Sequence, residues 1–160
     1  MELMNYSVDP ARIPAMSLPS ESQVLPFAWP LPGQDPQEVR ILVLDDQEII
    51  RVQLKRILKR SGFTVLEAPD AQMALEILNR EPVDLLLSDI QMPGMTGLDL
   101  MHALAHRIPD IAVIMVSGMD NLEMAMKCLH YGAYGYVLKP FKTSGILIAV
   151  ANALRRRMLE

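Results

Sequence analysis

Short apolar runs alternate with amphipathic helical patterns along most of this chain, and this rhythm limits its fold more than any other feature. We expect five strands, at residues 40–44, 63–66, 83–87, 111–116 and 133–138. Such short runs are typical of strands buried on both faces. A helical pattern follows each run after a short connection. The alternation predicts an α/β fold, a doubly wound five-stranded parallel sheet with helices on both faces.

Local signals locate several helix ends. Gly62 is expected to end the first helix, and Asp70 can cap the second. The fourth helix is expected from about Asn121 to His130, and the last from about Thr143 to the chain end. Basic side chains of the first helix, such as Arg51, are expected on its solvent face.

The first 38 residues have a different composition from the rest. Seven of the 12 prolines lie within residues 1–36, and each removes a backbone donor and fixes φ. We therefore expect a proline-rich flexible leader over 1–38, a folded domain over 39–157, and the start of a linker or a tag remnant at 158–160. The leader has one apolar patch, residues 24–29, with a docking site or a simple unstructured tail as the open alternatives.

Charge and composition narrow the class of protein. The formal net charge of −4 comes from the leader, and residues 39–160 sum to zero. A neutral domain gives no general case for direct nucleic-acid binding. No apolar stretch is long enough to span a bilayer, and the single cysteine, Cys128, excludes an internal disulfide. We expect a cytoplasmic protein that binds no membrane.

Polar side chains follow four of the five expected strands. Asp45 and Asp46 follow the first strand, and Asp89 follows the third. Ser117 and Lys139 follow the fourth and the fifth. In open α/β sheets, ligands bind beyond the carboxyl ends of the strands. These side chains are therefore expected to share one site.

The chemistry of that group favours a metal ion and a phosphoryl group. Three crowded carboxylates repel one another, and carboxylate oxygens suit Mg²⁺. The metal and the Lys139 ammonium together balance the three aspartates. A carboxylate can act as a nucleophile and form an aspartyl phosphate. Asp89 is the expected acceptor, Ser117 a hydrogen-bond donor to the attached group, and Mg²⁺ the cofactor.

The residues at the strand ends also resemble a known family, the receiver domain of bacterial two-component response regulators. The resemblance covers about residues 39–157. It is carried by Asp45-Asp46, Asp89-Ile90-Gln91-Met92-Pro93-Gly94-Met95-Thr96-Gly97, Ser117-Gly118 and Lys139-Pro140-Phe141. The combination is specific because these segments occur in order at the right strand ends. It implies a flavodoxin-like sheet with strand order 2-1-3-4-5.

The resemblance implies the ligands of a magnesium site. Asp89 matches the phosphoacceptor and a metal ligand. Asp46 matches a direct ligand, and Asp45 one that acts partly through water. The backbone carbonyl of Gln91 matches the remaining protein ligand.

Three further roles follow from the same resemblance. Lys139 and Ser117 match the residues that contact the phosphoryl group. Ser117 and Tyr136 match the switch pair, in which the aromatic ring turns inward when the hydroxyl moves. The peptide bond between Lys139 and Pro140 is expected to be cis, a form almost restricted to bonds before proline.

The implied function is a phosphorylation-dependent signalling switch of a two-component system or phosphorelay. Its partner is a sensor histidine kinase, and it catalyses only its own phosphorylation and dephosphorylation. The face spanning about 119–157 is expected to control an output domain or partner, or to form a homodimer through the last helices. No output domain is expected in this chain, which is either a stand-alone receiver or a fragment of a longer regulator; the charged helix at its end favours the fragment. Residues 148–157 are weakly similar to receivers attached to cyclic-di-nucleotide phosphodiesterase modules.

Two other readings remain open. The first is a phosphotransferase or phosphatase with an aspartate nucleophile, but haloacid-dehalogenase-like enzymes place an Asp-x-Asp motif after the first strand. The second is a nucleotide-binding fold, but no glycine-rich loop follows the first strand. For Asp45 and Asp46 taken alone, the alternative is a role as helix-cap acids, which the matching positions of Asp89 and Lys139 disfavour. For Arg155, Arg156 and Arg157 the alternatives are a contact with nucleic acid and a solvated position near a helix C-terminus, and we expect the second.

Overall fold

Five parallel strands form the centre of the computed structural model, which describes residues 33–108 and 110–160. The strands are β1 Arg40–Leu44, β2 Thr64–Ala68, β3 Leu85–Asp89, β6 Ala112–Ser117 and β7 Gly135–Leu138. Their order in the sheet is β2-β1-β3-β6-β7, and all four pairings are parallel. The predicted fold and strand order are therefore confirmed. A small antiparallel hairpin of β4 Gln91–Met92 and β5 Met95–Thr96 was predicted only as a loop.

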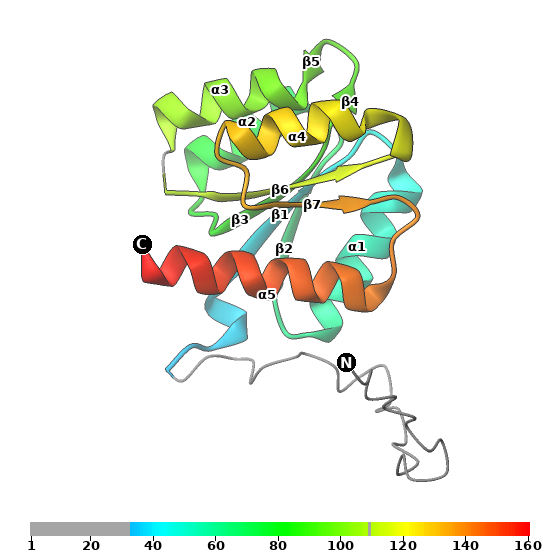
Figure 1. Ribbon diagram of the computed structural model, residues 1–160. Coiled ribbons are helices and arrows are strands. Elements are labelled where there is room, and N and C mark those ends of the chain that lie inside the picture. The colour runs from blue at the N-terminus through cyan, green and yellow to red at the C-terminus, as the bar shows by residue number, and fades with distance from the viewer. Residues whose placement is uncertain (1–32, 109) are drawn as a thin grey trace, which may run out of the picture.

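Helices cover both faces of the sheet (Figure 1). They are α1 Glu48–Arg60, α2 Ala71–Arg80, α3 Gly97–Arg107, α4 Leu122–His130 and α5 Thr143–Leu159. Helices α2, α3 and α4 lie on one face, and α1 and α5 lie on the other. Two short 3-10 helices, η2 Pro36–Glu38 and η3 Met119–Asn121, precede β1 and α4.

The alternation of side chains along the central strands explains the continuous apolar runs. In β1, Leu42 and Leu44 pack beneath α2, α3 and α4. Ile41 and Val43 pack on the opposite side, against α1 and α5. All four are fully buried, and each such side chain stabilises the fold by about 1.5–3 kcal/mol. Because both faces are covered, no position in these strands favours a polar side chain until the carboxyl end.

Four strands begin later than predicted. The predicted first residues are buried but precede β2, β3, β6 and β7; they are Phe63, Val83, Ile111 and Ala133. Apolar periodicity reports burial, whereas a strand assignment needs ladder hydrogen bonds, so the two differ at the ends. The predicted cap of α2 is confirmed, because the Met73 N–H donates to Asp70 Oδ1 at 2.8 Å.

The predicted leader falls mainly on residues 1–32, which lie outside the described residues. Of the remainder, Asp35 caps η2 through the Gln37 N–H, at 2.9 Å. The Thr64 hydroxyl donates to the Gln37 carbonyl at 2.8 Å and so fastens η2 to the start of β2. Among the described residues, no helix has the length and apolar character needed to cross a bilayer.

Candidate functional site

Four strands end at one edge of the sheet, and the residues singled out from the sequence gather there. Asp45 directly follows β1, Asp89 ends β3, Ser117 ends β6 and Lys139 directly follows β7. The parallel register fixes this arrangement, since Asp89 pairs with Val116 in the neighbouring strand. The arrowheads of the strands in Figure 1 point to this edge, which we call the carboxyl edge.

Three carboxylates form a cluster at the carboxyl edge. One oxygen each of Asp45, Asp46 and Asp89 lies within 4.8 Å of the other two. Asp45 and Asp89 are buried, and Asp46 is exposed. A compact group of hard oxygen donors that opens to solvent on one side fits a divalent cation such as Mg²⁺, which keeps several waters when bound.

Lys139 provides positive charge to this cluster. Its Nζ lies 2.8 Å from Asp45 Oδ2 and 3.5 Å from Asp89 Oδ2. Burial raises the pKa of Asp89, the nearby Lys139 ammonium partly lowers it again, and the charges of Asp45 and Asp46 raise it further. Three carboxylates around one ammonium leave an excess of negative charge, which favours the binding of a cation.

A tight loop holds the segment after Asp89. The Gln91 N–H donates to Asp89 Oδ1 at 3.3 Å. The Gly97 N–H donates to the Ile90 carbonyl at 2.7 Å and closes the loop around the hairpin. A Cβ atom on Gly97 would lie only 3.2 Å from Ile90 Cα, so a glycine allows this close approach. The loop therefore fixes both the Asp89 side chain and the backbone of Gln91.

Asp45 is held from two directions. Its Oδ1 accepts a hydrogen bond from the Gln47 N–H at 2.9 Å. The Arg51 guanidinium donates to the Asp45 backbone carbonyl at 2.8 Å. The expectation that Arg51 simply faces solvent is therefore wrong, because this residue is half-buried and supports the acidic loop. No local pattern distinguishes it from other basic residues of α1, since a long side chain selects a distant partner only in the folded chain.

The predicted switch residues lie on the neighbouring strands. Ser117 is fully buried, and its hydroxyl donates to the Gly118 carbonyl at 2.8 Å. The Lys139 N–H donates to the Ser117 carbonyl at 2.6 Å and links β6 to the loop after β7. Tyr136 is half-buried and packs against the apolar cluster beneath α2, α3 and α4. The peptide bond between Lys139 and Pro140 is cis.

Fold and site together define an α/β domain with an acidic cluster and a lysine at the carboxyl edge of a parallel sheet. The response regulator receiver domain family matches residues 41–151 of this chain. The chain therefore belongs to that family, as the sequence motifs predicted.

Several individual proteins are similar to this chain. A cyclic di-GMP phosphodiesterase of Thermotoga maritima is 32% identical over 120 residues, covering 75% of this chain and 32% of that protein. The C4-dicarboxylate transport transcriptional regulatory protein DctD of Rhizobium meliloti is 32% identical, covering 74% of this chain and 26% of that protein. The crystal structure of a response regulator receiver domain protein from Clostridium thermocellum has a TM-score of 0.72 and 31% identity, covering 76% of this chain and 98% of that one. The match thus spans about a third or less of the two curated relatives.

Proposed function

We propose that this chain is a signalling switch that accepts a phosphoryl group on Asp89 from a sensor histidine kinase. The observation that carries the proposal is the cluster of Asp45, Asp46 and Asp89, with Lys139 in contact with two of the three carboxylates. This arrangement crowds negative charge around a carboxylate and places an ammonium beside it. A group that only stabilised the fold would not need the excess charge.

In the proposed reaction, an oxygen of the Asp89 carboxylate attacks phosphorus. The bond from phosphorus to the donor atom breaks, and the donor, a histidine nitrogen of the kinase, keeps the electron pair. Lys139 donates a hydrogen bond to a phosphoryl oxygen and stabilises the transferring group. The chain catalyses this step and the later loss of the phosphoryl group, and turns over no other substrate.

Magnesium is the cofactor in this proposal. The side chains of Asp45, Asp46 and Asp89 and the backbone carbonyl of Gln91 would hold it. When bound, the ion supplies positive charge to the phosphoryl oxygens. The excess of carboxylates over ammonium groups in this cluster supports the assignment.

The switch would consist of Ser117 and Tyr136. The Ser117 hydroxyl is bonded to its own loop at Gly118, and we propose that it turns to a phosphoryl oxygen after transfer. The Tyr136 ring would then move further into the neighbouring apolar cluster. Phosphorylation in this way biases an equilibrium between two arrangements.

The output surface would be the face spanning residues 119–157. Leu122, Met126 and Leu138 are exposed apolar side chains there, which supports a contact with an output domain, a partner protein or a second copy of this chain. The matched relatives differ in their outputs, a phosphodiesterase in one and a transcriptional regulator in another. The receiver alone therefore does not specify which output this chain controls.

We further propose the limits and setting of the domain. The folded unit is about residues 39–157, preceded by the proline-rich leader, and α5 continues from it to Leu159. Because a histidine kinase donates the phosphoryl group, we place the domain in the cytoplasm. The neutral charge of residues 39–160 supports the absence of direct nucleic-acid contacts.

The test is intact-mass measurement after incubation with acetyl phosphate, with and without Mg²⁺. We expect one Mg²⁺-dependent phosphoryl adduct in the natural chain and none in Asp89→Asn. Asp84→Asn is a matched control, because this aspartate lies at the opposite edge of the sheet, and it should label normally. Persistent labelling of Asp89→Asn at another residue would overturn the assignment.

A further inference from the structure

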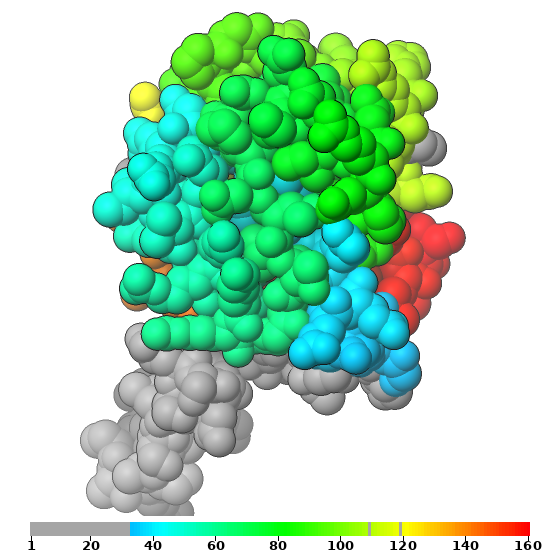
Figure 2. All heavy atoms as spheres, turned by 180° about the vertical axis from the view of Figure 1, so that it is seen from behind, coloured from blue at the N-terminus to red at the C-terminus, as the bar shows by residue number. Residues whose placement is uncertain are grey.

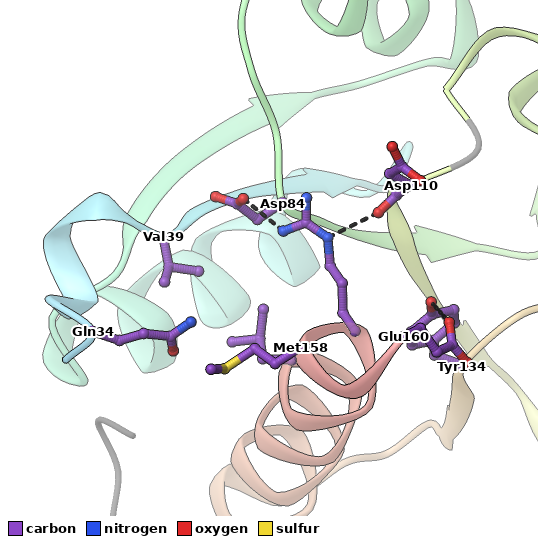
Figure 3. Close-up of a pocket in the computed structure, with 9 residues that line it drawn as sticks. Gln34, Val39, Asp84, Asp110, Tyr134, Met158 and Glu160 are labelled. Carbon is purple, nitrogen blue, oxygen red and sulfur yellow. Dashed lines mark hydrogen bonds and ion pairs between the residues drawn. The ribbon is translucent and has the colours of Figure 1, made fainter. Parts of the chain in front are cut away.

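A second hollow lies at the opposite end of the sheet from the acidic cluster, at what we call the amino edge. It is a cavity of about 440 Å³ between η2, the start of β1 and the last turns of α5 (Figure 3). Its lining includes Gln34, Val39, Leu154, Arg157 and Met158. Figure 2 shows the blue segment that contains η2 beside the red end of α5, although the two are far apart in the sequence.

Three of the charged side chains in this cavity, those of Arg157, Asp84 and Glu160, already have partners. Arg157 Nη1 lies 2.7 Å from Asp84 Oδ1, and Arg157 Nε donates to the Asp110 carbonyl at 2.8 Å. The second oxygen of Asp84 accepts the Arg40 N–H at 2.9 Å. The Tyr134 hydroxyl donates to Glu160 Oε2 at 2.6 Å. An occupant of the cavity therefore needs no charge of its own, and an anion would meet the carboxylates of Asp84 and Glu160.

One polar atom of the cavity lacks a partner. Gln34 Oε1 is buried and accepts no hydrogen bond among the described residues. The Gln34 side chain extends into the cavity toward Met158 (Figure 3). A buried acceptor without a donor is unfavourable. The cavity therefore favours an occupant that combines an apolar body with a single hydrogen-bond donor.

The apolar side of the cavity is also partly uncovered. Val39 and Leu154 are buried, whereas Met158 is 53% exposed at the end of α5. An aromatic or aliphatic side chain seated beside Met158 would remove this apolar surface from water.

We propose that the apolar patch of this chain's own leader, residues 24–29, occupies the cavity, with Trp29 as its anchor. An indole ring is apolar and carries one N–H donor, which is the chemistry that the unpartnered Gln34 oxygen requires. Residues 22–34 contain no Asp, Glu, Lys or Arg. The patch can therefore enter without burying an unpaired charge.

The path of the chain permits this contact. Gln34 is itself part of the cavity lining, so the apolar patch of the leader is only a few residues away from the cavity along the chain. Trp29 lies four residues before Gly33, and four residues span at most about 14 Å. Gly33 has a positive φ of 86° and lies in a turn, a conformation that lets the preceding segment change direction.

Such docking would connect the leader to the output side of the domain. The cavity is lined by the last two turns of α5, and α5 forms one border of the face spanning 119–157. A docked leader would cover Met158 and hold the end of α5 against η2. The proposal does not depend on the phosphoryl chemistry at the carboxyl edge, so each can fail alone.

Trp29 is the only tryptophan in the chain, so its intrinsic fluorescence reports directly on the proposed contact. In the full chain, we expect emission shifted to the blue and acrylamide quenching several-fold weaker than in a peptide of residues 22–34. Met158→Glu, which places a charge beside the indole, and Gln34→Ala, which removes the acceptor, should both return the emission toward that of the peptide. Ile49→Glu is the matched control, an apolar residue on α1 that is 67% exposed, and should change nothing.

Three outcomes would overturn the proposal. Emission of the full chain equal to that of the peptide means that Trp29 is exposed. A buried Trp29 that is unaffected by Met158→Glu and Gln34→Ala lies elsewhere. A blue shift that disappears on serial dilution places the leader in a second copy of the chain. Circular dichroism of each variant shows whether the fold is retained, and Met158 is exposed enough for a charged replacement to be tolerated.

Discussion

The two edges of the sheet hold the same kinds of group in different proportions. At the carboxyl edge, Asp45, Asp46 and Asp89 share one lysine, Lys139. At the amino edge, the carboxylate of Asp84 receives both a guanidinium N–H and a backbone N–H. A carboxylate whose oxygens are fully paired stabilises the fold. A surplus of carboxylates is unfavourable by itself and becomes useful only when a cation or a phosphoryl group arrives.

Arg157 and Lys139, the basic side chains at the two edges, also differ in how firmly their donors are bound. Arg157 uses its planar guanidinium to bind Asp84 and the Asp110 carbonyl together, so its donors are committed to the fold. Lys139 presents one ammonium that contacts two carboxylates at 2.8 and 3.5 Å. Such a point charge can exchange one oxygen for another with little rearrangement. The contacts of Arg157 thus commit the amino edge to one arrangement, whereas the single ammonium of Lys139 leaves the carboxyl edge free to rearrange.

The largest expected effect is on the rate of phosphoryl labelling, which should depend on the carboxyl edge and not on the amino edge. Lys139→Met removes the ammonium beside Asp89, and we expect labelling by acetyl phosphate to slow by about 10²- to 10³-fold. Arg157→Met should label at the natural rate. Time-resolved intact-mass measurement in Mg²⁺ gives both rates. Equal losses in the two variants would mean that the edges are not functionally distinct.

A second prediction concerns the metal. Asp46→Asn removes one charge from the cluster at an exposed position, and we expect Mg²⁺ affinity to fall by about tenfold or more. Asp84→Asn should leave the affinity unchanged. Isothermal titration calorimetry measures both. Unchanged affinity in Asp46→Asn would remove this residue from the ligand set.

A third prediction concerns stability, which should depend on the contacts at the amino edge. Arg157→Ala breaks a half-exposed ion pair and a hydrogen bond to a backbone carbonyl, and should lower the free energy of unfolding by about 1 kcal/mol. Urea denaturation in EDTA measures the change. Arg156→Ala is the control, because Arg156 pairs with Glu160 at a more exposed position, and its effect should be smaller. A larger loss in Arg156→Ala would mean that the contacts of Arg157 with Asp84 and Asp110 contribute less to stability than the more exposed pair of Arg156.

The smallest expected effect is a pH dependence of opposite sign at the two edges. The pKa of Asp89 is raised by burial, so the folded state holds this proton more tightly than the unfolded state. In EDTA, its contribution to stability is present at low pH and is lost as pH rises through the raised pKa. The pKa of Glu160 is lowered by the Tyr134 hydroxyl and Arg156, so its contribution is lost as pH falls.

Urea midpoints measured across the acidic range in EDTA test this difference. Asp89→Asn should remove the decrease in stability with rising pH, and Glu160→Gln should not. Saturating Mg²⁺ should weaken the decrease in the natural chain. A decrease of the same size in Asp89→Asn would assign it to another group.

Much of the fold and the candidate site could be predicted from local patterns. The buried strands were located because their side chains are apolar on both faces, as in β1. The shared position of Asp89 and Lys139 was predicted because parallel strands all end at one edge. The β4–β5 hairpin was missed, because two-residue strands leave no periodicity to detect.

The sequence-based predictions failed mainly for the contacts of long side chains. Arg157 was expected to be solvated, yet it binds Asp84, a residue 73 positions away in the sequence. Arg51 was expected to face solvent, yet it supports the Asp45 backbone. An arginine near a helix end looks the same in the sequence whether its side chain is solvated or binds a distant residue. Sequence alone therefore does not separate the two.

The sequence by itself determined the class of fold, the edge at which polar groups gather and the family, because periodicity and strand ends follow from backbone geometry common to all parallel sheets. Only the tertiary structure decided that Lys139 lies nearer to Asp45 than to Asp89, that Asp84 is fully paired, and that a cavity with an unpartnered Gln34 oxygen opens beneath α5. Those features depend on distances between elements far apart in the chain. Packing sets such distances, and no local pattern encodes them.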